Sequence, residues 1–292
     1  MKKCIVIGSC GYIGKHIVWY LAQMGIEAEC YDVKAFNDDQ EHYHHIDMTD
    51  YESVEKINFD VDYIFMFAGL TGTYAGFDAY ARYININEIA LLNLLTAIRK
   101  TSYRPKIIFP SSRLVYKGCD MALDEGSEKE TNTIYAVNKL ACEGYLQAYS
   151  KSFGIPYAIF RICVPYGNLL DEDYSFGTVG FFIKTASSGN NITLYGGGTL
   201  KRTFTHMYDI CNQMINGAFK SESTNQIFNI GGETYSLHDA AQIFAKKYGV
   251  SVVAVPWPEK DAKIESGHTY FDDSKIKSLF GGYSYKSINS LL

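Results

Sequence analysis

The chain has 292 residues, of which 47% are hydrophobic and 20% are charged, and its formal net charge is −5. This composition is typical of a soluble globular protein with a large apolar core, and it excludes disordered, collagenous and disulfide-stabilised miniprotein classes. The acidic balance excludes a general nucleic-acid surface. The length fits about two folding units, or one α/β body with a minor lobe.

The cysteines and the apolar segments favour a cytoplasmic protein that does not enter a membrane. The seven cysteines form no Cys-x-x-Cys pair, and most lie in apolar runs, where a thiol packs as a small hydrophobic group. The apolar run after the two N-terminal lysines is too short for a signal peptide. The apolar stretch at residues 63–70 falls far below the roughly 20 residues that span a bilayer.

Short apolar runs alternate with longer amphipathic segments along the first part of the chain. We expect strands at residues 4–7, 28–32, 63–68, 106–110 and 158–163, and helices at residues 12–24, 81–100 and 135–153. Repeated β-α alternation with continuous apolar strands favours a parallel sheet covered on both faces. The sequence therefore predicts an α/β fold with a doubly wound parallel sheet.

The pattern changes after about residue 165. Residues 168–177 are acidic and loop-like, residues 189–198 are rich in glycine and asparagine, and residues 228–230 resemble one more strand returning to the sheet. We predict a first domain made of residues 1–165 and about 203–232. A smaller C-terminal lobe would consist of about 166–202 and 233–292.

Three glycines follow the first expected strand and open the first helix. Gly8 permits the tight turn, Gly11 lets the backbone approach a diphosphate, and Gly14 lets the helix pack close to the strand. Asp32 ends the second strand, where a carboxylate can bind a ribose diol. The pattern predicts a dinucleotide site and favours NAD over NADP, although turn glycines and a surface aspartate would produce the same letters.

The Gly-x-x-Gly-x-x-Gly spacing resembles extended short-chain dehydrogenases/reductases, the family of NAD-dependent nucleotide-sugar epimerases and dehydratases. The resemblance continues in Pro110-Ser-Ser-Arg-Leu-Val-Tyr116 and in Tyr135-Ala-Val-Asn-Lys139, and later segments around Arg161, Arg202 and Phe228 follow in family order. It implies a Rossmann fold, a substrate-binding C-terminal lobe, a nucleotide-diphosphate sugar as substrate and NAD as cofactor, with NADP as the alternative. It also implies a role in polysaccharide biosynthesis.

The resemblance assigns the cofactor site residue by residue. The positions that match the family's cofactor-binding residues are Gly8, Gly11, Tyr12, Ile13, Gly14, Asp32, Asp47, Met48, Ala68, Gly69, Asn87, Tyr135 and Lys139. Among these, the resemblance implies that Asp47 binds the adenine and that Asn87 lies near the nicotinamide.

The resemblance implies that Ser112, Tyr135 and Lys139 are catalytic. Tyr135 and Lys139 stand four residues apart and therefore share one face of a helix. A phenol with a pKa near 10 is a poor base, but a nearby ammonium favours the phenolate. Tyr135 could then take a proton from a sugar hydroxyl while hydride leaves the same carbon. Ser112 would hold the reacting oxygen.

The substrate side departs from the family in several places. Arg113 and Leu114 replace the acid pair of the dehydratases, so we expect no dehydration. Val164 replaces an asparagine that contacts substrate in many epimerases, and a second diphosphate-binding arginine is missing from the C-terminal lobe. Arg202 matches the first such arginine, since a guanidinium fork suits phosphate oxygens. Arg113 could bind a substrate carboxylate or phosphate, or form a structural ion pair.

Two further expectations concern metals and assembly. His42, His44 and His45 have no accompanying ligand set, so no metal site is predicted. The resemblance implies a homodimer built on the helices that begin near Ala81 and Tyr135. We expect Leu91, Leu94, Leu95, Leu140 and Tyr145 to provide its apolar surface, with intramolecular packing of these residues as the alternative.

Three functions remain open from the sequence. The favoured function is an NAD-dependent epimerase of nucleotide-diphosphate sugars that inverts a carbon, most simply C4, through a keto intermediate. The second is an NAD(P)H-dependent reductase of 4-ketosugar nucleotides. The third is a relative that binds the dinucleotide without turnover, which the intact set of Ser112, Tyr135 and Lys139 disfavours.

Overall fold

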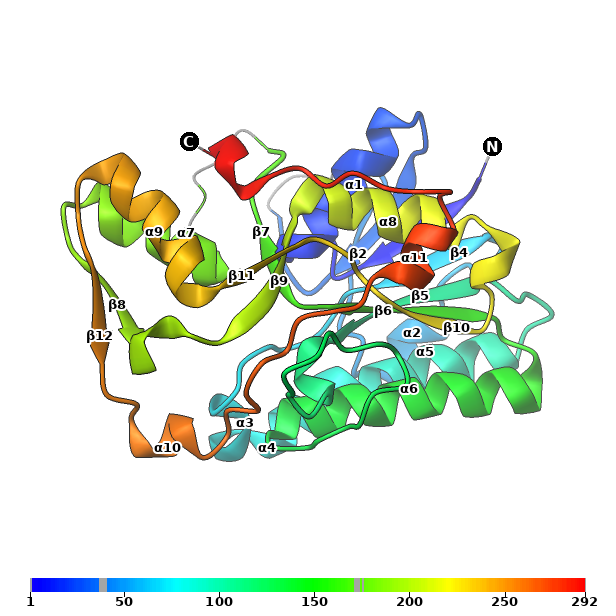
Figure 1. Cartoon of the computed structure of the whole chain (residues 1–292). Helices are drawn as coiled ribbons and strands as arrows, with labels where there is room; N and C mark the ends of the chain where they lie inside the picture. Colours follow the sequence, from blue (N-terminus) through cyan, green and yellow to red (C-terminus); the bar gives the residue numbers. More distant parts are fainter. Residues whose placement is uncertain (1, 37–40, 171–173, 175, 292) are drawn as a thin grey trace.

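A seven-stranded parallel sheet forms the centre of the molecule (Figure 1). The computed structural model describes residues 2–36, 41–170, 174 and 176–291. The strands are β1 (Cys4–Ile7), β2 (Ala28–Asp32), β3 (Tyr43–His45), β4 (Tyr63–Met66), β5 (Lys106–Ser112), β6 (Tyr157–Ile162) and β10 (Gln226–Asn229). Their order is β10-β6-β5-β4-β1-β2-β3, so the chain changes direction at β1 and leaves a crevice at the carboxyl ends of the strands. The predicted doubly wound α/β fold is confirmed.

Helices cover both faces of this sheet. On one face lie α1 (Tyr12–Gln23), α8 (Met207–Ala218) and α11 (Ser274–Ser278), and on the other lie α2 (Tyr51–Val54), α5 (Ala90–Arg99) and α6 (Ile134–Phe153) (Figure 1). Successive strand residues point to opposite faces, so Ile64 enters one apolar core and Phe65 enters the other. Burial on both faces explains why the central strands β1 and β4 read as unbroken apolar runs.

The expected single helix at residues 81–100 is interrupted in the structure. After α3 (Ala75–Asp78), the chain forms α4 (Tyr80–Ile84), a π-helical turn η1 (Asn85–Ile89) and then α5. The wider turn places Asn87 against the backbone of Leu70, and it shifts the phase of the apolar face that follows. Ile89, in the π-helical turn, is 36% exposed, whereas Leu91 at the start of α5 is fully buried.

The remaining elements form a smaller group beside the carboxyl ends of the large sheet (Figure 1). They are a three-stranded sheet of β7 (Val164–Tyr166), β9 (Lys201–His206) and β11 (Glu233–Ser236), a two-stranded sheet of β8 (Ile192–Tyr195) and β12 (Val252–Val255), and helices α7 (Gly177–Ser187), α9 (Leu237–Tyr248) and α10 (Glu259–Ala262). They share a third apolar core. Of the returning segment at about 203–232, β10 joins the large sheet, whereas β9 pairs with β7 in the smaller group. The predicted domain boundaries stay a prediction.

Three features of the described residues bear on the remaining expectations. All seven cysteines are free thiols. Within the described ranges, no helix is long and apolar enough to cross a bilayer. The same ranges contain no group of three or more histidine, cysteine, aspartate or glutamate side chains that could hold a metal ion.

Candidate active site

The glycine loop between β1 and α1 is shaped by close backbone contacts. Gly8 has a φ of +80°, and a Cβ atom there would lie 2.4 Å from the amide nitrogen of Ala68. A Cβ atom on Gly14 would lie 2.1 Å from the carbonyl oxygen of Gly8. A side chain at Gly8 would push the glycine loop away from the segment that follows β4. A side chain at Gly14 would push α1 away from the glycine loop. The N-terminus of α1 therefore opens onto the crevice, where its first amides can face an anion.

A cavity of about 860 Å³ lies on one side of the glycine loop. Its lining includes most of the residues expected to bind the adenosine half of the cofactor: Gly8, Gly11, Asp32, Asp47, Met48, Ala68 and Gly69. The Asp32 carboxylate accepts hydrogen bonds from the amides of Cys10 at 2.9 Å and Lys34 at 3.1 Å. Because a carboxylate has about four acceptor positions, Asp32 keeps capacity for a ribose diol.

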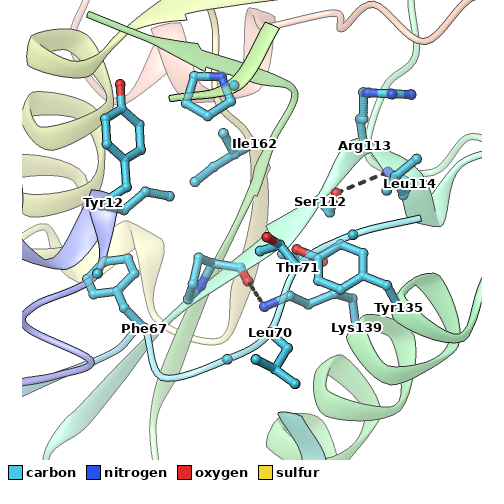
Figure 2. Close-up of a pocket in the computed structure, with 18 of the residues that line it drawn as sticks. Tyr12, Phe67, Leu70, Thr71, Ser112, Arg113, Leu114, Tyr135, Lys139 and Ile162 are labelled. Carbon is cyan, nitrogen blue, oxygen red and sulfur yellow. Dashed lines mark hydrogen bonds between the residues drawn. The ribbon is translucent and has the colours of Figure 1, made fainter. Parts of the chain in front are cut away.

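A second cavity, of about 490 Å³, adjoins the first and shares Gly8, Gly11, Phe67, Gly69 and Leu70 with it. It contains the three expected catalytic residues and the rest of the glycine loop: Tyr12, Ile13, Gly14, Ser112, Tyr135 and Lys139 (Figure 2). Arg113 and Val164, expected to contact substrate, also line it. Together the two adjoining cavities extend along the glycine loop from Asp32 to Tyr135.

Two elements, β5 and α6, bring the three expected catalytic side chains together. Ser112 ends β5, and its Oγ accepts a hydrogen bond from the amide of Leu114 at 3.2 Å. Tyr135 and Lys139 lie in the first turns of α6, whose N-terminus is capped by the Thr133 hydroxyl. The Lys139 Nζ donates to the carbonyl of Pro110 at 2.7 Å and lies 5.6 Å from the centre of the Tyr135 ring (Figure 2).

Burial shifts both titratable groups of this set toward their neutral forms. It raises the pKa of Tyr135 to about 12, although the hydrogen bond with Ser112 acts in the opposite direction. It also lowers the pKa of Lys139 to about 8. The pKa of Tyr135 is therefore governed by burial in this structure. A positive charge placed in the cavity beside the phenol would favour the phenolate.

Two of the expected site residues lie outside both cavities. Both polar atoms of the Asn87 side chain contact Leu70: Oδ1 accepts from its amide at 2.7 Å and Nδ2 donates to its carbonyl at 3.2 Å. Asn87 therefore contacts the backbone of a residue that lines both cavities, and its expected place near the nicotinamide stays a prediction.

The second is Arg202, which is 2% exposed. Its Nη2 forms an ion pair with Glu265 at 2.8 Å, and its Nη1 donates to the carbonyls of Lys201 and Gly267. The Arg202 guanidinium is thus engaged by Glu265 and by the backbone in this structure, and its expected contact with substrate phosphates stays a prediction.

Several residues that support the site were missed in the sequence. Arg161 on β6 is buried and forms a bidentate ion pair with Glu143 of α6, at 2.9 and 2.6 Å. Glu143 also accepts a hydrogen bond from Ser111, the residue before the expected catalytic serine. The spacing offered a signal, since Glu143 lies four residues beyond Lys139 on the same helix.

A stacked aromatic pair, Tyr12 and Phe176, lines the second cavity. Tyr12 stacks on Phe176 with ring centres 4.0 Å apart, and its hydroxyl donates to the carbonyl of Gly167 at 2.5 Å. These contacts join the glycine loop to the segment before α7. They could not be read from the sequence, since Tyr12 and Gly167 are 155 residues apart.

Known proteins share this architecture. A UDP-N-acetyl-alpha-D-glucosaminuronate decarboxylase of Bacillus cytotoxicus is 26% identical, over 82% of this chain and 78% of the relative. The structure resembles a UDP-glucose 4-epimerase of Thermotoga maritima with UDP-glucose (TM-score 0.84, 23% identity, 98% and 95% of the two chains). It also resembles a UDP-glucuronic acid 4-epimerase of Bacillus cereus in complex with UDP-glucuronic acid and NAD (TM-score 0.84, 22% identity, 99% and 96%).

The segment that matches a known family includes the residues that line both cavities around the glycine loop and Tyr135. The model of the NAD dependent epimerase/dehydratase family matches residues 4–231, which include the glycine loop, Ser112, Tyr135 and Lys139. The members of this family are enzymes that use NAD. With its doubly wound sheet, its dinucleotide cavity and this match, the chain belongs to the NAD dependent epimerase/dehydratase family.

Proposed function

We propose that the protein is an NAD-dependent epimerase of nucleotide-diphosphate sugars that inverts C4 of the sugar through a transient ketone. The observation that carries the proposal is the convergence of Ser112, Tyr135 and Lys139 on a cavity continuous with the dinucleotide cavity. The glycine loop and Asp32 would hold NAD, which would supply reversible hydride transfer at the sugar carbon.

The residues of the chain would move the proton and hold the sugar. Tyr135 would take the proton of the C4 hydroxyl as the ketone forms and return it when the ketone is reduced. Ser112 would hydrogen-bond the reacting oxygen. Lys139, already fixed by the Pro110 carbonyl, would place its ammonium beside the phenol. Leu114 lines the same cavity and cannot transfer a proton, which disfavours dehydration.

The remaining assignments of the cofactor site are also proposals. Gly8, Gly11 and Gly14 would surround the diphosphate of the cofactor, and Asp32 would bind the adenosine ribose. The carboxylate of Asp32 would repel a 2′-phosphate, which favours NAD over NADP. These assignments are supported by the positions of the four residues around the glycine loop.

The stoichiometry of the cofactor separates an epimerase from a ketoreductase. In an epimerase the hydride that leaves the sugar returns to it within one turnover, so the cofactor is not consumed. Product should therefore form from a UDP-sugar without net change in absorbance at 340 nm. A reductase would consume one NAD(P)H per product. One cofactor consumed per product would refute the epimerase. Unchanged UDP-sugars, despite binding of both cofactor and sugar nucleotide, would instead favour a non-catalytic relative.

We further propose that the enzyme acts in the cytoplasm as a homodimer and supplies sugars for polysaccharide biosynthesis. The free state of all seven cysteines supports a reducing compartment. Exposed apolar side chains on α4, η1 and α6 support an interface between two copies.

A further inference from the structure

The substrate half of the second cavity has an unusual charge distribution. No aspartate or glutamate occurs among the described residues that line this cavity, and its two cationic residues are Arg113 and Lys139. Lys139 directs its ammonium to the Pro110 carbonyl, beside Tyr135. Arg113 is therefore the cationic group available to the part of a ligand that lies away from the phenol.

The guanidinium of Arg113 has little to bind within the described part of the chain. Arg113 follows Ser112 directly and is half-buried, and its Nη1 donates to the hydroxyl of Thr269 at 3.0 Å. It forms no ion pair with a described carboxylate. A guanidinium has five N–H donors, so most of its hydrogen-bonding capacity is left for a ligand or water.

The acidic side chain that contacts Arg202, the arginine near Arg113, is already engaged. Arg202 lies close enough to Arg113 for the two positive charges to repel each other, and Glu265 pairs with Arg202 rather than with Arg113. Glu265 also accepts a hydrogen bond from the amide of Gly267, which fixes its position. A half-buried cation without a counter-ion is costly, and an anionic ligand removes that cost.

We propose that Arg113 binds an oxyanion of the sugar nucleotide, either its diphosphate or a carboxylate on its sugar. This proposal rests on the proposed function, because the ligand class is that of the epimerase. Thr269, which is fully buried, holds the Arg113 side chain in place (Figure 2 shows Arg113 above Ser112). Arg113 is then a substrate-binding residue placed one position from the reacting centre.

The test compares two ligands that differ in one carboxylate. Calorimetric titration of the NAD-loaded protein with UDP-glucose and with UDP-glucuronic acid gives two dissociation constants. We expect Arg113→Gln to raise at least one of them by about 10- to 100-fold, since it removes a charged hydrogen bond. Arg113→Lys keeps the charge but loses the planar guanidinium. Its dissociation constants should lie between those of wild type and those of Arg113→Gln. Arg99→Gln, an exposed arginine of α5, is the matched control and should change neither constant.

The pattern of losses identifies the oxyanion. An equal loss of affinity for both ligands assigns Arg113 to the diphosphate. A loss of affinity confined to UDP-glucuronic acid assigns it to the sugar carboxylate. Unchanged constants for both ligands in Arg113→Gln overturn the proposal, as does a wild-type protein that binds neither. If the glutamine variant does not fold, the same criteria apply to Arg113→Lys, with an expected rise of a few-fold.

Failure of the proposed function would leave a different signature. A wild-type protein that binds the sugar nucleotides and loses affinity in Arg113→Gln, but converts neither sugar, refutes the epimerase and keeps the role of Arg113. The melting temperature and the NAD affinity of each variant serve as further readouts. A purely structural role would lower the melting temperature and the NAD affinity, and it would leave the ratio of the two sugar-nucleotide dissociation constants unchanged.

Discussion

At the scale of single residues, the hydroxyl of Tyr135 carries the proposed proton transfer. Tyr135→Phe should reduce turnover by about 10²- to 10⁴-fold, the usual contribution of a positioned acid or base. The change removes one oxygen atom from a packed side chain, so the fold and the NAD affinity should be retained. Turnover of a UDP-sugar and titration with NAD measure the two effects.

The control for this substitution lies on the same helix. Tyr149 of α6 bonds the Thr96 hydroxyl outside both cavities, and Tyr149→Phe should leave turnover unchanged. Activity of Tyr135→Phe above a tenth of the wild-type value would mean that another group transfers the proton.

The buried Lys139 predicts a dependence of stability on pH. Its pKa is about 8 in the folded protein, below the value of about 10.4 in an unfolded chain. The unfolded state therefore binds more protons between these values, so the free energy of unfolding should rise with pH through this window. The contribution is about 3 kcal/mol at full extent. Urea unfolding of NAD-free protein at pH 7.5 and 9.5 should show a smaller rise in Lys139→Met than in wild type.

A second buried lysine provides the comparison. Burial also lowers the pKa of Lys106 to about 8, and its Nζ donates to the carbonyls of Ala218 and Lys220, away from the cavities. Lys106→Met should lose a similar part of the pH dependence while it keeps turnover. Equal slopes in wild type and Lys139→Met would contradict the assigned pKa.

Residue roles were predictable where the partners lie close in sequence. The spacing of Tyr135 and Lys139 places them on one helix face, and the position of Ser112 at the end of an apolar strand directs it to the crevice. The contact of Arg202 with Glu265 could not be predicted, because the two residues lie 63 positions apart in the chain. No local pattern indicates that pairing.

At the scale of elements, α6 is joined to the sheet by the buried ion pair between Arg161 and Glu143. Glu143→Ala would leave the Arg161 guanidinium buried without its counter-ion and would remove the acceptor of Ser111. We expect a loss of about 3–5 kcal/mol in the free energy of unfolding, measured in urea. Glu259→Ala breaks an exposed pair with Lys263 and should change stability little. Equal effects of the two substitutions would contradict a structural role for Glu143.

Elements were predictable where their pattern is local. The strands β1, β2, β4, β5 and β6 are marked by short apolar runs, and the helices α1 and α6 follow the 3.6-residue period. These elements were therefore expected close to their observed bounds. The π-helical turn η1 was missed because it depends on the contact between Asn87 and Leu70, which are 17 residues apart. The 3.6-residue spacing of apolar residues predicts a regular helix. It does not show where a tertiary contact widens a turn.

At the scale of the whole molecule, the structure changes the argument for a dimer. Leu91, Leu94 and Leu95 were expected to provide apolar surface, but all three are fully buried within the chain. Their expected part in an interface was wrong, because η1 turns this face of α5 toward the sheet and α6. Other apolar side chains on the same helices remain exposed: Ile84 at 38%, Ile89 at 36% and Val137 at 42%.

These three side chains lie on elements that pack against one another, since α6 contacts both α4 and η1. Their exposure together supports a helical interface between two copies, whose burial would remove apolar surface from water. We therefore expect light scattering at micromolar concentration to give twice the chain mass of 32.9 kDa. Val137→Glu would place a charge in this interface and should yield the monomer, whereas Val253→Glu, on exposed β12, should leave the dimer intact. A wild-type mass of one chain would refute the homodimer.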